Sequence, residues 1–247
     1  MVNYLTFEEI QEKCEKLQDV YEIDEEKFYH IVEKWANEKT TIEQKLVASF
    51  SELLQQVSDE ITSMEESVDM QATCRMGCAF CCYFPIIINE MEAKLMQKSI
   101  ANFPAERKRK IQQHLSRYYE KYGEKLDQIT AINFEEDENF KYKYRKSLVP
   151  CPLLNTDTNK CMAYEIRPIP CRTYMNYTDP KVCEQDVMPK ETISFEFLYG
   201  EYMGALNEFL QFLVEEGDTG FIEYPNDVYA HNYLAIWLKE SFHEGVN

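Results

Sequence analysis

The chain has 247 residues, enough for one or two domains with a full hydrophobic core. Hydrophobic residues make up 45% of it and only seven residues are glycine, a composition that favours helices over β-sandwiches, barrels and glycine-rich phosphate loops. The formal net charge of −18 argues against binding to nucleic acid or to anionic lipid.

Helical periodicity dominates the first 70 residues. One helix is expected from about Phe7 to Tyr21, and Asp24 is expected to cap a second one. Thr41 opens a third helix, along which apolar residues recur at helical spacing: Leu46, Phe50, Leu53, Leu54, Val57 and Ile61. Three amphipathic helices in a row predict a helical hairpin or a bundle arm over residues 1–70. This arm is the surface through which we would expect a protein partner to bind.

The middle of the chain contains two further predicted helices. Asn89 and Glu92 have capping-box spacing, so one helix should begin at Asn89 or at the next residue. Pro104 should begin the next helix, which runs to about Gln128. Its basic run, residues 107–110 (RKRK), is interpreted as a solvated helix face rather than a polyanion site. Residues 132–150 are acidic and rich in tyrosine, and they show no clear period.

The remaining chain is a turn-rich segment followed by two helices. Residues 151–183 are dense in Pro, Asn, Asp and Thr, which predicts turns with one short hairpin around residues 153–164. An apolar stripe from Phe195 to Leu213 predicts the first closing helix, and the second is expected from about Asp227 to Phe242. We expect an N-terminal helical arm (1–70), a cysteine-cluster metal-binding region (71–190) and C-terminal helices packed on it (191–247), all forming one compact unit.

The cellular location bears on how the nine cysteines are interpreted. Residues 1–10 (MVNYLTFEEI) have neither a basic start nor a long apolar stretch, so no signal peptide is expected. The most apolar stretch, residues 193–214, carries Glu196, Glu201 and Glu208, so no membrane span is expected. We therefore expect a cytoplasmic protein. In that reducing compartment, clustered thiols are more often metal ligands or redox groups than disulfides.

The cysteines form two groups in the two stretches that lack helical periodicity. Residues 74–82 read CRMGCAFCC, with four thiols in nine residues, and a second group lies between residues 151 and 183. Metal binding could fix such stretches, because its free energy becomes folding free energy. Iron–sulfur clusters commonly take three thiolates from a tight run and one from far away, whereas structural zinc usually takes two C-x2-C pairs. The spacing favours an iron–sulfur cluster, of the four-iron type, and leaves zinc open.

Three cysteines of the first group also have the spacing found in a known class of enzymes. Cys74, Cys78 and Cys81, with Phe80 before the last of them, have the spacing of radical S-adenosylmethionine enzymes. The helices do not alternate with strands, no Gly-Gly-Glu-type segment follows, and Cys82 has no place in that pattern. Cys14 stands apart in the first predicted helix and is interpreted as a buried or half-buried thiol.

Both groups together resemble the YkgJ-type cysteine-cluster family, a zinc- or iron-chelating domain. The resemblance rests on CxxxCxxCC and on a later CPLLNTDTNKCMAYEIRPIPCR, in which Tyr164 and the Arg167-Pro168 pair fall in the family's order. A similar cysteine pattern in flagellin lysine-N-methylase implies a link to methyl transfer. The resemblance implies eight metal ligands: Cys74, Cys78, Cys81, Cys82, Cys151, Cys161, Cys171 and Cys183.

Two roles are possible for each of several residues around the cysteines. Arg167 and Arg172 could neutralise a thiolate-rich site or bond backbone carbonyls in the turn. Aromatic residues beside the first group could shield a cluster from water or simply pack: Phe80, Tyr83 and Phe84. The histidines are expected on helices far from the cysteines and are not predicted to be ligands: His30, His114, His231 and His243.

The sequence thus predicts a mainly α-helical, bundle-like protein with a loop-rich cysteine centre that metal stabilises. Its predicted function is that of a cytoplasmic metal-binding protein whose cysteines ligate an iron–sulfur cluster or zinc, in a redox or metal-handling role. One alternative is an S-adenosylmethionine-linked enzyme, such as a protein lysine methylase or a radical enzyme. The other is a structural zinc site in a protein-interaction module. The sequence leaves open whether the protein is an oxidoreductase, a methyltransferase or no enzyme, and what its oligomeric state is.

Overall fold

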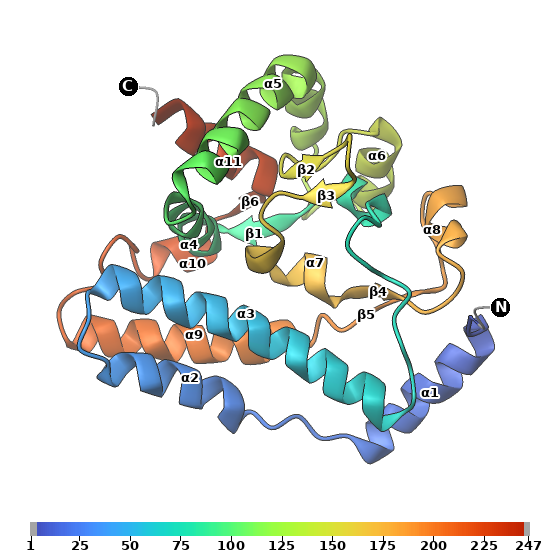
Figure 1. Cartoon of the computed structure of the whole chain (residues 1–247), viewed down its shortest axis with the longest axis horizontal. Helices are drawn as coiled ribbons and strands as arrows, with labels where there is room; N and C mark the ends of the chain where they lie inside the picture. The colour runs from blue at the N-terminus through green and yellow to red at the C-terminus, as the bar shows by residue number, and fades with distance from the viewer. Residues whose placement is uncertain (1–3, 245–247) are drawn as a thin grey trace. The chain divides into compact units, whose positions relative to one another are not determined.

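The computed structural model describes the backbone of residues 4–244 and the side chains up to Glu240. The fold is mainly α-helical, as predicted, with a few short strands (Figure 1). The chain divides into two compact units, each built from two separate stretches. Unit 1 consists of Met1–Arg75 and Arg167–Tyr224, and unit 2 consists of Met76–Ile166 and Pro225–Asn247. The predicted borders near residues 70 and 190 stay a prediction. No helix in the described part is both long and apolar enough to cross a bilayer.

Unit 1 is built around three helices that lie side by side in Figure 1, where α2 contacts both α3 and α9 and these two contact each other. Its core is made of fully buried side chains on these helices, including Phe28, Phe50, Leu54 and Phe209. In chain order its elements are α1 (Phe7–Val20), α2 (Glu26–Asn37), α3 (Ile42–Ser67), α7 (Ile169–Thr173), β4 (Tyr174–Asn176), α8 (Lys181–Gln185), β5 (Thr192–Ser194) and α9 (Leu198–Glu215).

The starts of α1 and α3 follow local capping signals, whereas the start of α2 does not. Thr41 caps α3 as predicted, since its hydroxyl accepts from the Gln44 N–H at 3.3 Å in a complete capping box. The prediction that Asp24 caps α2 is wrong. The cap residue is Glu25, which already has helical angles and makes no side-chain cap bond, so the helix begins one residue later without a capping side chain.

Unit 2 surrounds the long helix α5 and a two-stranded sheet. In chain order its elements are η1 (Phe80–Tyr83), β1 (Ile87–Asn89), α4 (Glu90–Ala101), α5 (Ala105–Thr130), α6 (Phe140–Ser147), β2 (Leu154–Asn155), β3 (Lys160–Cys161), η2 (Tyr164–Ile166), α10 (Asn226–Tyr229), β6 (His231–Tyr233) and α11 (Leu234–Glu244). Asn89 caps α4 through the predicted capping box with Glu92, and Pro104 precedes α5 as predicted. Because α11 contacts both α4 and α5, the last helix closes this unit.

The closing segment differs from the single helix expected from Asp227 to Phe242. A short strand, β6, interrupts it and pairs antiparallel with β1, with Ile87 opposite Tyr233. The strand therefore separates α10 from α11, and it places the buried Tyr233 ring in the unit 2 core. The side chain of Phe242, where the helix was expected to end, lies outside the described residues.

Helix α6 lies in the tyrosine-rich stretch that showed no period. Its Tyr144 ring is buried and stacks on Tyr233, with ring centroids 5.7 Å apart and planes 14° apart. The helix ends at Leu148, which has a φ of +55°, in the left-handed region. The chain then turns directly towards Cys151.

The short hairpin predicted around residues 153–164 is confirmed. Strands β2 and β3 pair antiparallel, with Leu154 opposite Cys161 and Asn155 opposite Lys160. The Asn155 side-chain carbonyl accepts from the N–H groups of Asp157 at 3.0 Å and Thr158 at 3.1 Å, which fixes the connecting turn. The hairpin therefore holds Cys161 on a defined strand.

Candidate metal centre

The first cysteine group is divided between the two units. Cys74 belongs to unit 1 and is exposed in the segment that follows α3. Cys78, Cys81 and Cys82 belong to unit 2 and are all half-buried. Cys81 and Cys82 are adjacent residues of the short 3-10 helix η1.

The second cysteine group is divided in the same way. Cys151 is buried and Cys161 half-buried in unit 2, where the β2–β3 hairpin connects them. Cys171 lies in α7 and Cys183 in α8, both in unit 1. Unit 2 thus holds Cys78, Cys81, Cys82, Cys151 and Cys161, and unit 1 holds Cys74, Cys171 and Cys183.

A backbone hydrogen bond joins the two groups within unit 2. The Cys151 N–H donates to the Cys82 carbonyl at 2.6 Å. The Leu154 N–H then donates to the Cys151 carbonyl at 2.9 Å, and Leu154 lies opposite Cys161 in the hairpin. Two backbone hydrogen bonds and the pairing of β2 with β3 therefore connect Cys82, Cys151 and Cys161, although Cys82 is far from the other two in the sequence.

The environment of Cys151 shows which thiols lie near it. Burial, together with the thiols of Cys161 and Cys81, raises the pKa of Cys151 to about 12. The Cys161 and Cys81 thiols are thus each within electrostatic reach of Cys151. Phe84 and Tyr144 line a small cavity beside Cys151, so one side of the thiol faces aromatic rings.

The cation beside the unit 2 thiols comes from α5, where the sequence had not suggested one. Arg107 donates two hydrogen bonds, at 3.2 and 2.6 Å, to the carbonyl of Met162, the residue that follows Cys161. It also pairs with the Glu165 carboxylate, which raises the pKa of Arg107, and the Cys161 thiol contributes to the same shift. Arg107 therefore ties β3 to α5 and places a positive charge near Cys161.

The structure favours one of the two readings of Arg172. Its Nε donates to the Arg167 carbonyl at 2.8 Å, and a terminal nitrogen donates to the Ser58 hydroxyl at 2.6 Å. Arg172 is buried and links α7 to α3. It therefore holds the turn that carries Cys171 through its bond to a backbone carbonyl.

The unit 1 cysteines occupy a second neighbourhood. The Cys74 sulfur accepts from the Asn176 N–H at 3.3 Å, which ties it to β4. The nearby Tyr177 hydroxyl donates to Glu65 at 2.7 Å. Burial raises the pKa of Tyr177, and the thiols of Cys74 and Cys14 add to that shift. Cys14 is half-buried in α1, as predicted, yet it lies within electrostatic reach of the same tyrosine as Cys74.

Residues 73–191, just under half of the chain, match the family model CxxCxxCC, described as a putative zinc- or iron-chelating domain. We refer to this matched segment as the CxxCxxCC domain. The match confirms the resemblance to a cysteine-cluster family, and all eight predicted ligands lie inside it. No curated protein and no solved structure matches the chain. Helices α1 to α3 precede the CxxCxxCC domain, and α9 to α11 follow it.

The donors of the CxxCxxCC domain suit zinc or iron in kind. Both metals take soft thiolate ligands, and in unit 2 the thiols of Cys161 and Cys81 each lie within electrostatic reach of Cys151. Among the side chains that the structure describes, no three Cys, His, Asp or Glu groups converge as the ligands of one metal ion would. The eight-cysteine ligand set therefore stays a prediction, supported by donor chemistry and by the backbone bond between the two groups.

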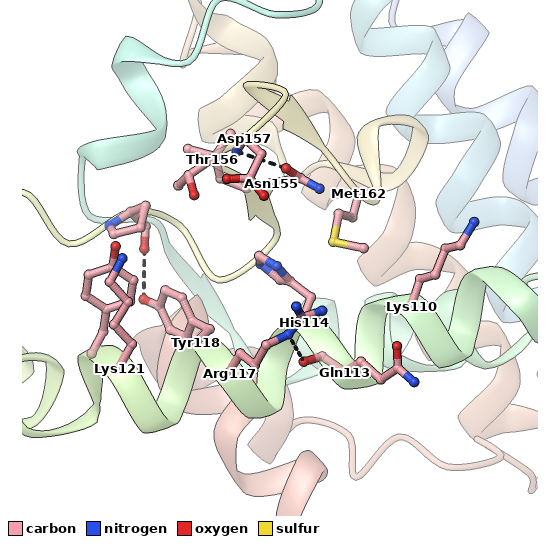
Figure 2. A pocket seen from close by; sticks show the side chains of 13 residues that line it. Lys110, Gln113, His114, Arg117, Tyr118, Lys121, Asn155, Thr156, Asp157 and Met162 are labelled. Atoms are coloured by element: carbon pink, nitrogen blue, oxygen red, sulfur yellow. Dashed lines mark hydrogen bonds between the residues drawn. The ribbon is translucent and has the colours of Figure 1, made fainter.

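The expectation that every histidine lies far from the cysteines is wrong for His114. Its ring forms a hydrogen bond with the backbone of Pro152, the residue after Cys151. It shares one face of α5 with Lys110, Arg117 and Lys121, and all four line a pocket beneath the β2–β3 hairpin (Figure 2). Successive spacings of four, three and four residues were the sequence signal for this face. His231 lies in β6 rather than in a helix, and the side chain of His243 lies outside the described residues.

Proposed function

We propose that the CxxCxxCC domain holds a zinc or iron centre with four unit 2 cysteines among its ligands: Cys81, Cys82, Cys151 and Cys161. The observation that carries this proposal is the 2.6 Å hydrogen bond from the Cys151 N–H to the Cys82 carbonyl, because it joins the two cysteine groups. The other four ligands that the resemblance implies stay predictions: Cys74, Cys78, Cys171 and Cys183.

An iron–sulfur cluster in a redox or metal-handling role is the form of this centre that we favour. A tight run of thiols with a distant fourth thiol is the usual ligand arrangement for such a cluster, which supplies one-electron transfer when bound. The protein's own residues would tune the site. Arg107 offsets negative charge at Cys161, and the rings of Phe84 and Tyr144 keep water from one side of Cys151.

Metal and acid-labile sulfide analysis of protein purified without oxygen tests the proposal. The wild-type protein should contain iron and sulfide in stoichiometric amounts and should be brown. Cys81→Ala and Cys151→Ala should each lose most of both, because each removes a ligand. Cys14→Ala is the control, since it removes a half-buried thiol outside the predicted ligand set and should keep the wild-type content.

The same measurements separate the other functions. If both ligand variants keep their full metal content, the assignment of Cys81 and Cys151 fails. A colourless protein with stoichiometric zinc would overturn the redox role in favour of a structural zinc site in an interaction module. An S-adenosylmethionine-linked enzyme would bind S-adenosylmethionine in calorimetry, and absence of heat would count against that class.

A further inference from the structure

The pocket beneath the β2–β3 hairpin belongs entirely to unit 2 and has a volume of about 310 Å³. Helix α5 forms its floor, and the turn at residues 155–157 forms its opposite wall (Figure 2). The volume lies at the lower end of the range for small-molecule sites, so it suits a compact ligand.

The charge of the pocket is opposite to that of the protein. The chain carries 44 acidic residues against 26 Lys and Arg residues, yet the pocket lining includes Lys110, Arg117 and Lys121 with Asp157 as its single carboxylate. Arg117 is held on the helix by a bond from its Nε to the Gln113 carbonyl at 3.1 Å. The Lys121 ammonium lies 4.8 Å from the centre of the Tyr122 ring, and Lys110 pairs with Glu106 at 2.7 Å. The net positive lining favours an anion.

His114 lines the same pocket without adding to its charge. Its Nε2 atom is buried and does not open onto the pocket. Burial lowers the pKa of His114, which favours the neutral ring. Figure 2 shows this ring rising from α5 into the space below the turn.

We propose that this pocket binds a small organic anion. Its carboxylate or phosphate would lie against Lys110, Arg117 and Lys121. Because the pocket lies next to the Pro150–Pro152 segment and Met162, the anion would bind beside the residues that flank Cys151 and Cys161. The site does not depend on whether a metal is present.

Titration calorimetry of the full-length protein with L-malate, succinate and inorganic phosphate tests this inference. L-malate and succinate each carry two carboxylates, so both should bind through attraction to the three cations of the pocket lining. Tighter binding of phosphate than of either acid would support the site and assign phosphate as its anion.

Two matched variants on α5 test the charge. Arg117→Gln should weaken the binding of all three probes by about tenfold, because it removes a cation from the pocket. Arg109→Gln makes the same charge change at an exposed position of the same helix outside the pocket lining, and it should leave binding unchanged. The inference is overturned if no probe binds at about 10 mM, or if the two variants weaken binding equally.

Discussion

At the scale of single residues, Tyr118 connects α5 to the main chain that leads into Cys151. Its hydroxyl donates to the Pro150 carbonyl at 2.8 Å, and its ring packs edge-on against Tyr119 with centroids 5.1 Å apart. Burial raises the pKa of Tyr118, so the residue remains a protonated donor through neutral and moderately alkaline pH. This hydroxyl therefore helps to fix the position of Pro150, the residue that precedes Cys151.

Tyr118→Phe should lower the free energy of unfolding by about 1–3 kcal/mol, because it leaves the buried Pro150 carbonyl without its donor. Tyr119→Phe is the matched control, since the Tyr119 hydroxyl also donates to a backbone carbonyl, that of Ala235, at 2.9 Å. Urea denaturation should show a loss in both variants. Only Tyr118→Phe should also reduce metal content, and equal metal content in the two variants would contradict the role assigned to Tyr118.

At the scale of elements, the end of α6 stores backbone strain a few residues before Cys151. Leu148 adopts a φ of +55°, which costs a residue with a Cβ atom about 1 kcal/mol or more, and its side chain is 63% exposed. Glycine is the usual residue at this position of a helix end. The chain accepts the strain because α6 must stop before Val149, which is fully buried in the core.

Leu148→Gly should therefore raise the free energy of unfolding by up to about 1 kcal/mol, as measured by urea denaturation. Leu148→Ala removes nearly the same exposed side chain but keeps a Cβ atom, so it should give no gain. A gain of equal size in both variants would mean that loss of the exposed side chain, and not relief of strain, is responsible.

Local signals account for the elements that could be predicted from the sequence. The capping boxes at Thr41 and Asn89 act within one helical turn, and the Asn155 turn acts within four residues. The cysteine spacing is likewise local, and the family match to residues 73–191 confirms the resemblance drawn from it.

The features that could not be predicted depend on contacts between distant residues. Strand β6 forms because residues 231–233 pair with residues 87–89, and α6 is fixed when Tyr144 stacks on Tyr233. The pocket exists only because the hairpin lies over one face of α5, so the sequence predicts no more than a solvated face for the basic run at residues 107–110. The position of Arg107 near Cys161 could not be predicted either, because the two residues are far apart in the sequence.

At the scale of the whole molecule, the net charge of −18 sets how the protein responds to salt. Such an excess of one sign destabilises a folded chain through self-repulsion. The same excess supports our proposal that nucleic acid is not a partner, since the protein would repel phosphates rather than neutralise them.

Raising the ionic strength from about 0.01 M to about 0.15 M shortens the screening length from about 30 Å to about 8 Å. The thermal unfolding midpoint should rise, because repulsion between the acidic side chains weakens. Potassium chloride and sodium chloride should have the same effect if screening is the cause. A midpoint that falls or stays constant would mean that exposed ion pairs, such as Lys34 with Glu52, outweigh the repulsion.

Each unit is built from two separate stretches of the chain, so unit 1 can be completed only late in translation. Phe50 and Leu54 on α3 belong to the same unit as α9, which the ribosome makes only after residues 76–166. At about 5–20 residues per second, that delay lasts about 5–20 s. During this interval the nascent amino-terminal helices would expose the apolar surface that α9 contacts in the finished protein. Unit 1 would therefore be complete only after the last third of the protein has emerged.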